Sequence, residues 1–493
     1  MTPRLADLGA ELVLDATRVI LRLFLPGEGL TPTRSRAADV VARITALSRA
    51  EIRAASDELV AAFGDRHDDL DEQLARHAET VAFRTPTDLR PEPALEVVLG
   101  AAFTAEYAVE AAALCNPSAM VHPDQSGLDE HQLRLAIALR CIGEGHVSSV
   151  GFASAVIGPG RRWEFEPRAS PMATPAIGDG TWTREGLREA LESEHRLNEL
   201  SGAVIRALPD EFRTSELETA IGAVPADLTR RREAHGDLDT IRTMAWSAYS
   251  ASFAPETRLS QRVLMPVSDE ESNGIEDARF VSFTDADGTE EYRATYTAYD
   301  GRSIAPRLLV SRDLRSYSMH RLLGPAATNK GMGLFPRTID GIHWALTRTD
   351  GENISIATSA DGRSWESAGV VRRPRHLWET VQLGNCGSPI ETDRGWLVIT
   401  HGVGPMRRYS IGAILLDLDD PRRVLADLAS PLLRPDGDLQ DGYVPNVVYS
   451  CGGIVHDGTL WLPYGVGDQR VRAAAIDLDE LLDALEPTGG RSA

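Results

Sequence analysis

Hydrophobic positions in the first quarter of the chain follow a helical period. Between residues 37 and 62, apolar side chains recur at helical spacing among Arg and Glu, and similar stretches continue to about residue 112. The sequence therefore predicts an α-helical N-terminal domain over residues 1–112, whose charged side chains form solvated faces. Two later stretches, residues 183–208 and 215–235, are also charged and helix-prone, which predicts a helical insertion at about residues 180–240.

The remaining pattern is that of short strands and turns. A polar, loop-like stretch at residues 115–125 precedes the alternating run 133–139, which predicts a strand. From about residue 260 onward, strands and turns dominate, and the pattern Ser-x-Asp-x-x-Ser-aromatic occurs at residues 311–317 and again at 359–365. A period of about 40–50 residues built from short strands is typical of β-propeller blades. In each copy we expect the Asp to bond turn amides and the aromatic ring to pack between blades.

Composition narrows the range of partners. The chain has 493 residues, a net charge of -22 and 42% hydrophobic residues, enough for a sizeable core. The acidic balance argues against binding to nucleic acid or to an anionic membrane surface. The N-terminus lacks a basic segment followed by an apolar run, so no signal peptide is expected. The sequence offers no metal-ligand spacing, and we expect neither a metal nor an organic cofactor.

Cysteine usage indicates the compartment. Cys115, Cys141, Cys386 and Cys451 are scattered, and none lies in a Cys-x-x-Cys pair. Isolated cysteines in a large chain without a signal peptide are typical of reduced thiols, so a cytoplasmic location is expected.

The stretch at residues 272–280, Ser-Asn-Gly-Ile-Glu-Asp-Ala-Arg-Phe, carries the strongest candidate chemistry. Side chains alternate faces along a strand, so Glu276 and Asp277 are not expected to point into one cleft, whereas Asp277 and Arg279 share a face. A carboxylate with a cation nearby is a candidate general acid. The alternative is an ordinary surface ion pair where a strand begins.

Polar stretches at later strand ends supply cations. Lys330, His401 and Arg407 fall about one blade apart, and a propeller would bring them to the same cavity as Asp277. Lys, His and Arg without metal-ligand spacing suggest an anion site, most simply for phosphate. Taken singly, each is as well explained as a surface cation. The Gly-Glu-Gly-His segment at residues 143–146 is either a solvated turn or the rim of a cleft.

Taken together, these motifs resemble a known family. The set comprises Gly-Ile-Glu-Asp-Ala-Arg at 274–279, Asn-Lys at 329–330 ahead of Leu-Phe-Pro at 334–336, Gly-Trp-Leu-Val-Ile-Thr-His-Gly-Val at 395–403, and Gly-Asp at 467–468. It resembles glycoside hydrolase family 130, the β-mannoside phosphorylases and related β-mannosidases, over roughly residues 115–480. The resemblance implies a mainly β fold, a five-bladed β-propeller over residues 113–493 with a central active-site pocket.

The resemblance also implies roles. Asp277 takes the place of the catalytic acid, and the phosphate site would comprise Arg140, Lys330, His401 and Arg407. The residues expected in the sugar pocket are Asn116, Asp124, Asn273, Arg279 and Asp468. The helical N-terminal region and the insertion depart from the simplest family members, which leaves the acceptor side open.

The leading hypothesis is inverting phosphorolysis of a β-mannoside, which transfers mannose to inorganic phosphate and gives α-mannose 1-phosphate. Phosphate is the nucleophile and co-substrate, so one protein carboxyl group, on Asp277, suffices. The alternative is an inverting hydrolase with a second carboxylate about 6.5–9.5 Å away as base. Glu144, Asp124 and Asp468 are the candidates for that base. A non-catalytic sugar-binding propeller is a third hypothesis, and a homo-oligomer is a further expectation.

Overall fold

The computed structural model describes residues 5–27, 35–82 and 92–488. The chain divides into two compact units. The smaller unit comprises residues 15–111 with 169–173, and the larger unit comprises the rest. The expected N-terminal domain over residues 1–112 includes stretches outside the described residues. The strand β1 (Ala6–Val13) belongs to the larger unit, so the first residues of the chain do not fold with the helices that follow them.

The smaller unit is helical, with one short antiparallel strand pair. Strands β2 (Val19–Leu23) and β3 (Thr104–Ala108) pair with each other. The helices are α1 (Arg36–Thr45), α2 (Arg49–Phe63), α3 (Leu70–Ala82) and α4 (Pro93–Ala102), with the short turn η1 (Gly64–Arg66). Helices α3 and α4 touch at Gly100, where a Cβ would lie 2.0 Å from the carbonyl oxygen of Leu74. The strands are a departure from the purely helical expectation, because residues 19–23 and 104–108 are too short for periodicity to distinguish.

The larger unit is mainly β, and its longest sheet runs β4-β5-β6-β13-β14-β15-β16-β11-β8, with β7 and β12 also paired to β6. Neighbouring strands in this sheet are antiparallel except β6 and β13, which meet through one parallel pair, Ser148 and Gly274. The strands are β4 (Ala113–Val121), β5 (Leu133–Ile142), β6 (Ser148–Gly158), β7 (Arg162–Phe165), β8 (Ala176–Asp179), β11 (Tyr249–Ser252), β12 (Val263–Leu264), β13 (Gly274–Thr284), β14 (Glu290–Tyr299), β15 (Ile304–Ser311) and β16 (Ser316–Arg321).

Apart from the antiparallel pair of β9 (Thr181–Thr183) and β10 (Glu211–Arg213), three further sheets complete the β part of this unit. The first contains β17 (Gly333–Leu334), β18 (His343–Thr347), β19 (Ile354–Ser359) and β20 (Glu366–Arg372). The second contains β21 (Gln382–Asn385), β22 (Ile390–Thr392), β23 (Gly395–Gly404), β24 (Arg408–Leu416), β25 (Val424–Asp427) and β30 (Glu486–Pro487). The third contains β1, β26 (Val448–Tyr449), β27 (Ile454–His456), β28 (Thr459–Val466) and β29 (Arg470–Asp477), followed by helix α10 (Leu478–Asp483).

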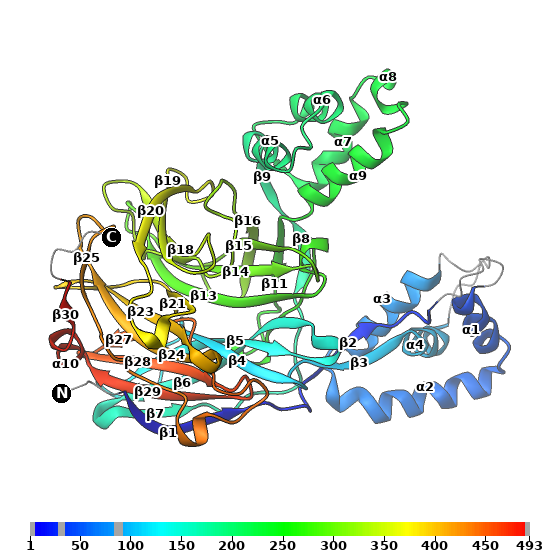
Figure 1. Ribbon diagram of the computed structural model, residues 1–493. Helices are drawn as coiled ribbons and strands as arrows, with labels where there is room; N and C mark the ends of the chain where they lie inside the picture. The colour runs from blue at the N-terminus through cyan, green and yellow to red at the C-terminus, as the bar shows by residue number, and fades with distance from the viewer. Residues whose placement is uncertain (1–4, 28–34, 83–91, 489–493) are drawn as a thin grey trace. The chain divides into compact units, whose positions relative to one another are not determined.

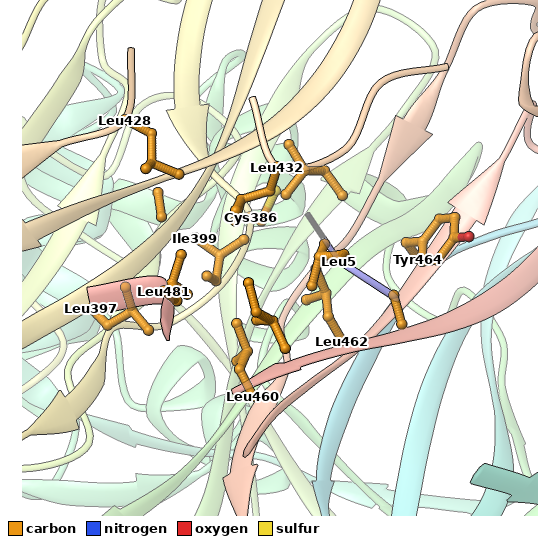
Figure 2. Packing of buried hydrophobic residues seen from close by; sticks show 14 of the residues in the cluster. Leu5, Cys386, Leu397, Ile399, Leu428, Leu432, Leu460, Leu462, Tyr464 and Leu481 are labelled. Carbon is orange, nitrogen blue, oxygen red and sulfur yellow. The ribbon is translucent and has the colours of Figure 1, made fainter. Parts of the chain in front are cut away.

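The first strand of the chain completes the last sheet. Strand β1 pairs antiparallel with β29, and Figure 1 shows the two side by side. Leu5, just before β1, is buried in a core that lies between this sheet and the preceding one (Figure 2). Leu397 and Ile399 of β23 and Leu460 and Leu462 of β28 contribute to the same core. Apolar burial therefore ties residues from both ends of the chain together.

The two sequence repeats close hairpins as predicted. In the first, the amides of Arg315 and Ser316 donate to Asp313 at 2.9 and 2.8 Å. In the second, two amides donate to Asp361 at 2.8 and 2.9 Å. The aromatic residue of each copy is buried, and Trp365 packs in a core with residues of both the β13–β16 region and the β17–β20 sheet. The structural interpretation of these turns is confirmed.

The helical segment between β9 (Thr181–Thr183) and β11 has its own core. It contains α5 (Arg184–Ser193), α6 (Glu199–Ala207), β10 (Glu211–Arg213), α7 (Leu217–Gly222), α8 (Ala226–Thr229) and α9 (Ala234–Ala245). We call residues 181–248 the insertion; it occupies the region where the sequence predicts one. Leu323, just after β16, is buried in the same core and anchors the insertion to the sheet.

One segment of the larger unit, residues 115–121, was predicted wrongly. Residues 115–121 are not a loop but part of the buried strand β4. Polar residues are accommodated there because a bulge between Cys115 and Ser118 takes Asn116 and Pro117 out of the regular ladder. All four cysteines are buried and unpaired. Among the described residues, no helix is long and apolar enough to cross a membrane.

Candidate active site

The site is built around a bulge in strand β13. The pairing of β13 with β14 shifts register between Glu276 and Arg279, and Asp277 has a positive φ of 55°. Strand β13 begins at Gly274, where a Cβ would lie 2.8 Å from Ser148. A glycine is therefore required for β13 to approach β6 so closely. The bulge breaks the alternation of side chains, so neighbouring residues can turn the same way.

Arg140, at the end of β5, joins the two adjacent acids. Its Nη2 lies 2.5 Å from Glu276 Oε1, and its Nη1 lies 3.2 Å from Asp277 Oδ1. Its Nε donates to the hydroxyl of Ser148 at 3.0 Å. The prediction that Glu276 and Asp277 cannot reach one cleft is therefore wrong, because the bulge places both carboxylates on one guanidinium.

A second bulge supplies a hydrogen-bond donor to Asp277. Asn116 has a positive φ of 50° in the bulge of β4, and its side-chain amide donates to Asp277 Oδ1 at 2.5 Å. Strands β4 and β13 are held together next to this contact, since the amide of Phe280 donates to the hydroxyl of Ser118 at 3.0 Å. Two bulged strands thus hold Asp277 between an amide and a guanidinium.

Two buried guanidiniums lie close to one another beside this carboxylate. Arg279 is 2% exposed and donates to the carbonyl of Asn385 at 2.6 Å and to the hydroxyl of Tyr449 at 2.7 Å. Arg348 lies 3.0 Å from His401 Nε2. Within the described residues, neither guanidinium contacts a carboxylate. Both therefore keep a positive charge that no acid neutralises by direct contact.

The loop after residue 328 brings a further cation to the same place. Lys330 is half-exposed, and its Nζ lies 3.7 Å from Glu276 Oε2. At the next residue, Gly331, a Cβ would lie 3.6 Å from one nitrogen of Arg279 and 3.9 Å from one of Arg348. Arg140, Arg279, Lys330 and Arg348 therefore gather around Glu276 and Asp277. We call these six residues the charged cluster.

His401 is placed differently from the expectation of a phosphate-binding cation. It is 1% exposed, and burial together with Arg348 and Arg279 lowers its pKa well below the usual range. Because arginine can only donate, His401 Nε2 is the acceptor in its bond with Arg348. A neutral imidazole cannot offset the charge of a phosphate, so His401 acts on the site by orienting Arg348.

Electrostatics separates the acids of the site. Burial would raise the pKa of Asp277, but Arg140 and Lys330 together with the hydrogen bond from Asn116 outweigh it and lower the pKa to about 2. For Asp468, burial dominates and raises the pKa to about 6, with the charge of Asp277 adding to the effect and Arg140 opposing it. At neutral pH Asp277 is thus firmly ionised, whereas Asp468 is a carboxylate held at a cost.

This cost predicts that Asp468→Asn stabilises the protein at high pH. The folded pKa of about 6 lies above the ordinary value of 3.8, so this group destabilises the fold increasingly as the pH rises from about 4 to 6, and the full cost is present above pH 6. We expect the variant to gain about 1–3 kcal/mol in the free energy of unfolding at pH 8. The gain should nearly vanish at pH 3, where the carboxyl group of Asp468 is largely protonated in both the folded and the unfolded state. Urea unfolding at the two pH values measures it, and an equal effect at both would contradict the assignment.

Several predicted residues lie outside the charged cluster. Asp124 is exposed, and its carboxylate accepts from the amide of Ser126 at 2.9 Å in the β4–β5 loop, so its expected place in the sugar pocket is not supported by any contact. Asn273 and Glu144 are exposed in turns. Arg407 is exposed in the turn η8 (Pro405–Arg407), although its charge acts on Asp468. Arg279 does join the cluster, and its two terminal nitrogens already donate to the carbonyl of Asn385 and the hydroxyl of Tyr449.

Sequence reasoning missed Arg348, Tyr449, Asn385 and Ser148, and it excluded Glu276. Arg348 directly follows β18, and Arg140 lies two residues before the end of β5, so an Arg near a strand end was the signal that could have found Arg348. Gly274 was the signal for Ser148, because a glycine at the start of a strand indicates a close neighbour, and a Cβ at Gly274 would lie 2.8 Å from Ser148. Nothing in the sequence alone marks Tyr449 or Asn385 as neighbours of Arg279, which is more than 100 residues away from each.

Comparison with known proteins places the chain in a family. Residues 251–487 match the family model described as beta-1,4-mannooligosaccharide phosphorylase. The 1,2-beta-oligomannan phosphorylase of Thermoanaerobacter sp. (strain X514) is 33% identical over 229 residues, which cover 45% of this chain and 75% of that protein. The chain belongs to glycoside hydrolase family 130.

A second relative points to the same group. The beta-1,2-mannobiose phosphorylase of Listeria innocua serovar 6a is 32% identical over 236 residues, covering 45% of this chain and 63% of that protein. The solved structure of the Listeria innocua beta-1,2-mannobiose phosphorylase in complex with beta-1,2-mannobiose covers 77% of this chain and 93% of its own, with 21% identity and a TM-score of 0.46. Residues 251–487, which match the family model, include Asp277, Lys330 and Arg348, whereas Asn116 and Arg140 lie outside this range.

Proposed function

We propose that the protein is an inverting β-mannoside phosphorylase that releases α-mannose 1-phosphate. The observation that carries the proposal is the pair of buried guanidiniums, Arg279 and Arg348, that touch no carboxylate among the described residues. Beside them, Asp277 is held between Arg140 and Asn116. Unneutralised guanidiniums favour an anion such as phosphate. The names of the related phosphorylases support the same substrate class.

In the proposed reaction, an oxygen of phosphate attacks the anomeric carbon from the face opposite the leaving group. The bond from that carbon to the glycosidic oxygen breaks, and the oxygen takes the proton carried by Asp277, relayed through a sugar hydroxyl as the family resemblance implies. The hydrogen phosphate proton then replaces the one that Asp277 gave, so the reaction balances. Arg140, Arg279, Lys330 and Arg348 orient phosphate and offset its charge, and no cofactor or metal is invoked.

The low pKa of Asp277 fits this order of events. Arg140 and Lys330 hold the carboxylate ionised, with a pKa of about 2, in the absence of phosphate. A phosphate dianion placed among the same cations would offset their charge and raise the pKa of Asp277. We therefore propose that Asp277 becomes an acid only when phosphate is bound. Asn116 and Asp468 are proposed to bind sugar hydroxyls.

We propose a five-bladed β-propeller as the frame of this site. If the long sheet is divided at the single parallel pair between Ser148 and Gly274, two antiparallel sheets result, and with the other three they make five. The pairing of β1 with β29 would close the ring of blades, and the β4–β7 sheet would be the first of them.

The four unpaired thiols support a cytoplasmic location.

The deciding experiment incubates the purified protein with a panel of β-mannosides, with and without inorganic phosphate. We expect mannose 1-phosphate to form only when phosphate is present. Equal release of free mannose in both conditions would instead mean a hydrolase. In that case Asp468 would be the first base to test, because Glu144 and Asp124 have no contact with the charged cluster.

A further inference from the structure

A cavity of about 690 Å³ lies between the insertion and the edge of the long sheet. The insertion supplies one wall from β9, α5 and the β10 region. The other wall comes from the end of β16 in the long sheet and from the turn after β19 in the β17–β20 sheet. The volume of the cavity falls within the range of about 300–1,000 Å³ that is typical of small-molecule sites. Strand β16 is the third strand from β13 in the sheet, so this cavity is separate from the charged cluster.

Polar contacts fix the two walls to each other. The hydroxyl of Ser364 donates to Glu189 of α5 at 2.5 Å. Arg321, at the end of β16, pairs with Glu194, at the end of α5. These contacts and the buried Leu323 hold the cavity in shape, so a ligand would meet a preformed site.

Two side chains of the sheet wall have unused hydrogen-bonding capacity. His320 is 5% exposed and lines the cavity, and its Nδ1 has no hydrogen-bond partner among the described residues. Arg363 lines the cavity too, and within the same residues its guanidinium takes part in no hydrogen bond or ion pair. The unpaired Nδ1 of His320 is itself shielded from the cavity, so among these two side chains Arg363 is the one with donors left for a ligand.

The lining excludes some classes of ligand. Five carboxylates outnumber three guanidiniums, which argues against an anion; the acids are Glu185, Glu189, Glu211, Glu216 and Asp361, and the bases are Arg213, Arg321 and Arg363. Burial and the nearby arginines lower the pKa of His320 to about 3, so the imidazole is neutral at physiological pH. Trp182 and Phe212 add apolar surface. The wall therefore offers acceptors, donors and a hydrophobic face together.

We propose that this cavity is a second, non-catalytic binding site for a neutral saccharide. Sugar hydroxyls both donate and accept, so adjacent hydroxyls can pair with a carboxylate and a guanidinium at once. The C–H face of the ring can then contact the small exposed part of Trp182, which is 7% exposed. The choice of a β-mannoside as the saccharide rests on the proposed function of the charged cluster.

The repeats provide a matched pair of variants for testing this. Arg363 occupies the fifth position of the second turn, and Arg315 occupies the same position of the first, outside the cavity and half-exposed. Each change is introduced into the full chain carrying Asp277→Asn, which is expected to slow turnover about 10²–10⁴-fold. Calorimetric titration with β-1,2-mannobiose is expected to show two binding events. Arg363→Gln should weaken one of them about 10-fold or more, whereas Arg315→Gln should leave both unchanged.

The result separates this inference from the proposed function. A single binding event in every variant, no binding at all, or equal effects of Arg363→Gln and Arg315→Gln would overturn the second site. In the otherwise natural chain, Arg363→Gln should leave the turnover number for mannobiose unchanged. If no mannose 1-phosphate forms while the Arg363-dependent binding persists, the proposed function fails and the second site stands.

Discussion

Asp277→Asn is expected to lower the rate of β-mannoside phosphorolysis by about 10²–10⁴-fold, the range that a positioned general acid contributes. Asparagine keeps the shape of the side chain but cannot deliver a proton to the leaving group. Binding of phosphate should survive, because Arg140, Arg279, Lys330 and Arg348 remain. The measurement is the initial rate of mannose 1-phosphate formation at saturating phosphate, together with circular dichroism to verify the fold.

The matched control is Asp124→Asn. Asp124 was a candidate for the sugar pocket and for the base of a hydrolase, but it is exposed and its carboxylate accepts from the amide of Ser126. We expect its rate to equal that of the unmodified protein. Full activity of Asp277→Asn would remove Asp277 from the mechanism, and a comparable loss in Asp124→Asn would show that the site extends to the β4–β5 loop.

Arg140→Met is expected to have the second-largest effect, on stability as well as on activity. Arg140 contacts both Glu276 and Asp277, whose side chains are 10% and 12% exposed, so its loss leaves two largely buried carboxylates without that cation. Removing one partner of a buried ion pair typically costs about 3–5 kcal/mol. The KM for phosphate should also rise, because one cation of the proposed phosphate site is gone.

The pH dependence of that loss is a sharper test. The folded pKa of Asp277, about 2, lies below the ordinary 3.8, so its ionised form stabilises the fold above pH 3.8 and this contribution is lost as the pH falls towards 2. The stability difference caused by Arg140→Met should therefore be largest at pH 7 and smaller at pH 3. Urea unfolding at both pH values measures it, and a difference that grows on acidification would contradict the pairing.

Two further variants separate charge from packing. Arg134 lies on the same strand, β5, and pairs with the more exposed Glu166 at 3.0 Å. The variant Arg134→Met should therefore leave the KM for phosphate unchanged. Combining Arg140→Met with Glu276→Gln removes one of the two carboxylate charges that lose Arg140 as their partner. The combination should recover part of the lost stability without recovering activity. No recovery would mean that packing of the Arg140 side chain, and not charge, accounts for the loss.

In the candidate site, local sequence patterns did not predict the orientation of Glu276 and Asp277 or the charge of His401. Alternation along a strand predicted that Glu276 and Asp277 face opposite ways, and a single bulge reversed that result. His401 was expected to be a cation, but its partners, Arg348 and the surrounding core, make it neutral. In both cases the residue type was identified correctly from the chain, while its orientation or charge depended on neighbours distant in sequence.

The sequence by itself determined the local elements and the chemistry available. Short alternating runs specified strands, the Ser-x-Asp turns specified hairpin ends, and four short motifs taken together pointed to the family, because each of these features depends on residues close together along the chain. Only the tertiary structure decided that β1 completes the last sheet, that Asn116 and Arg140 reach Asp277, and that Arg279 and Arg348 remain without a contacting acid. Those outcomes depend on contacts across more than 100 residues and on burial, which sets the charge of each group, and no local pattern encodes either.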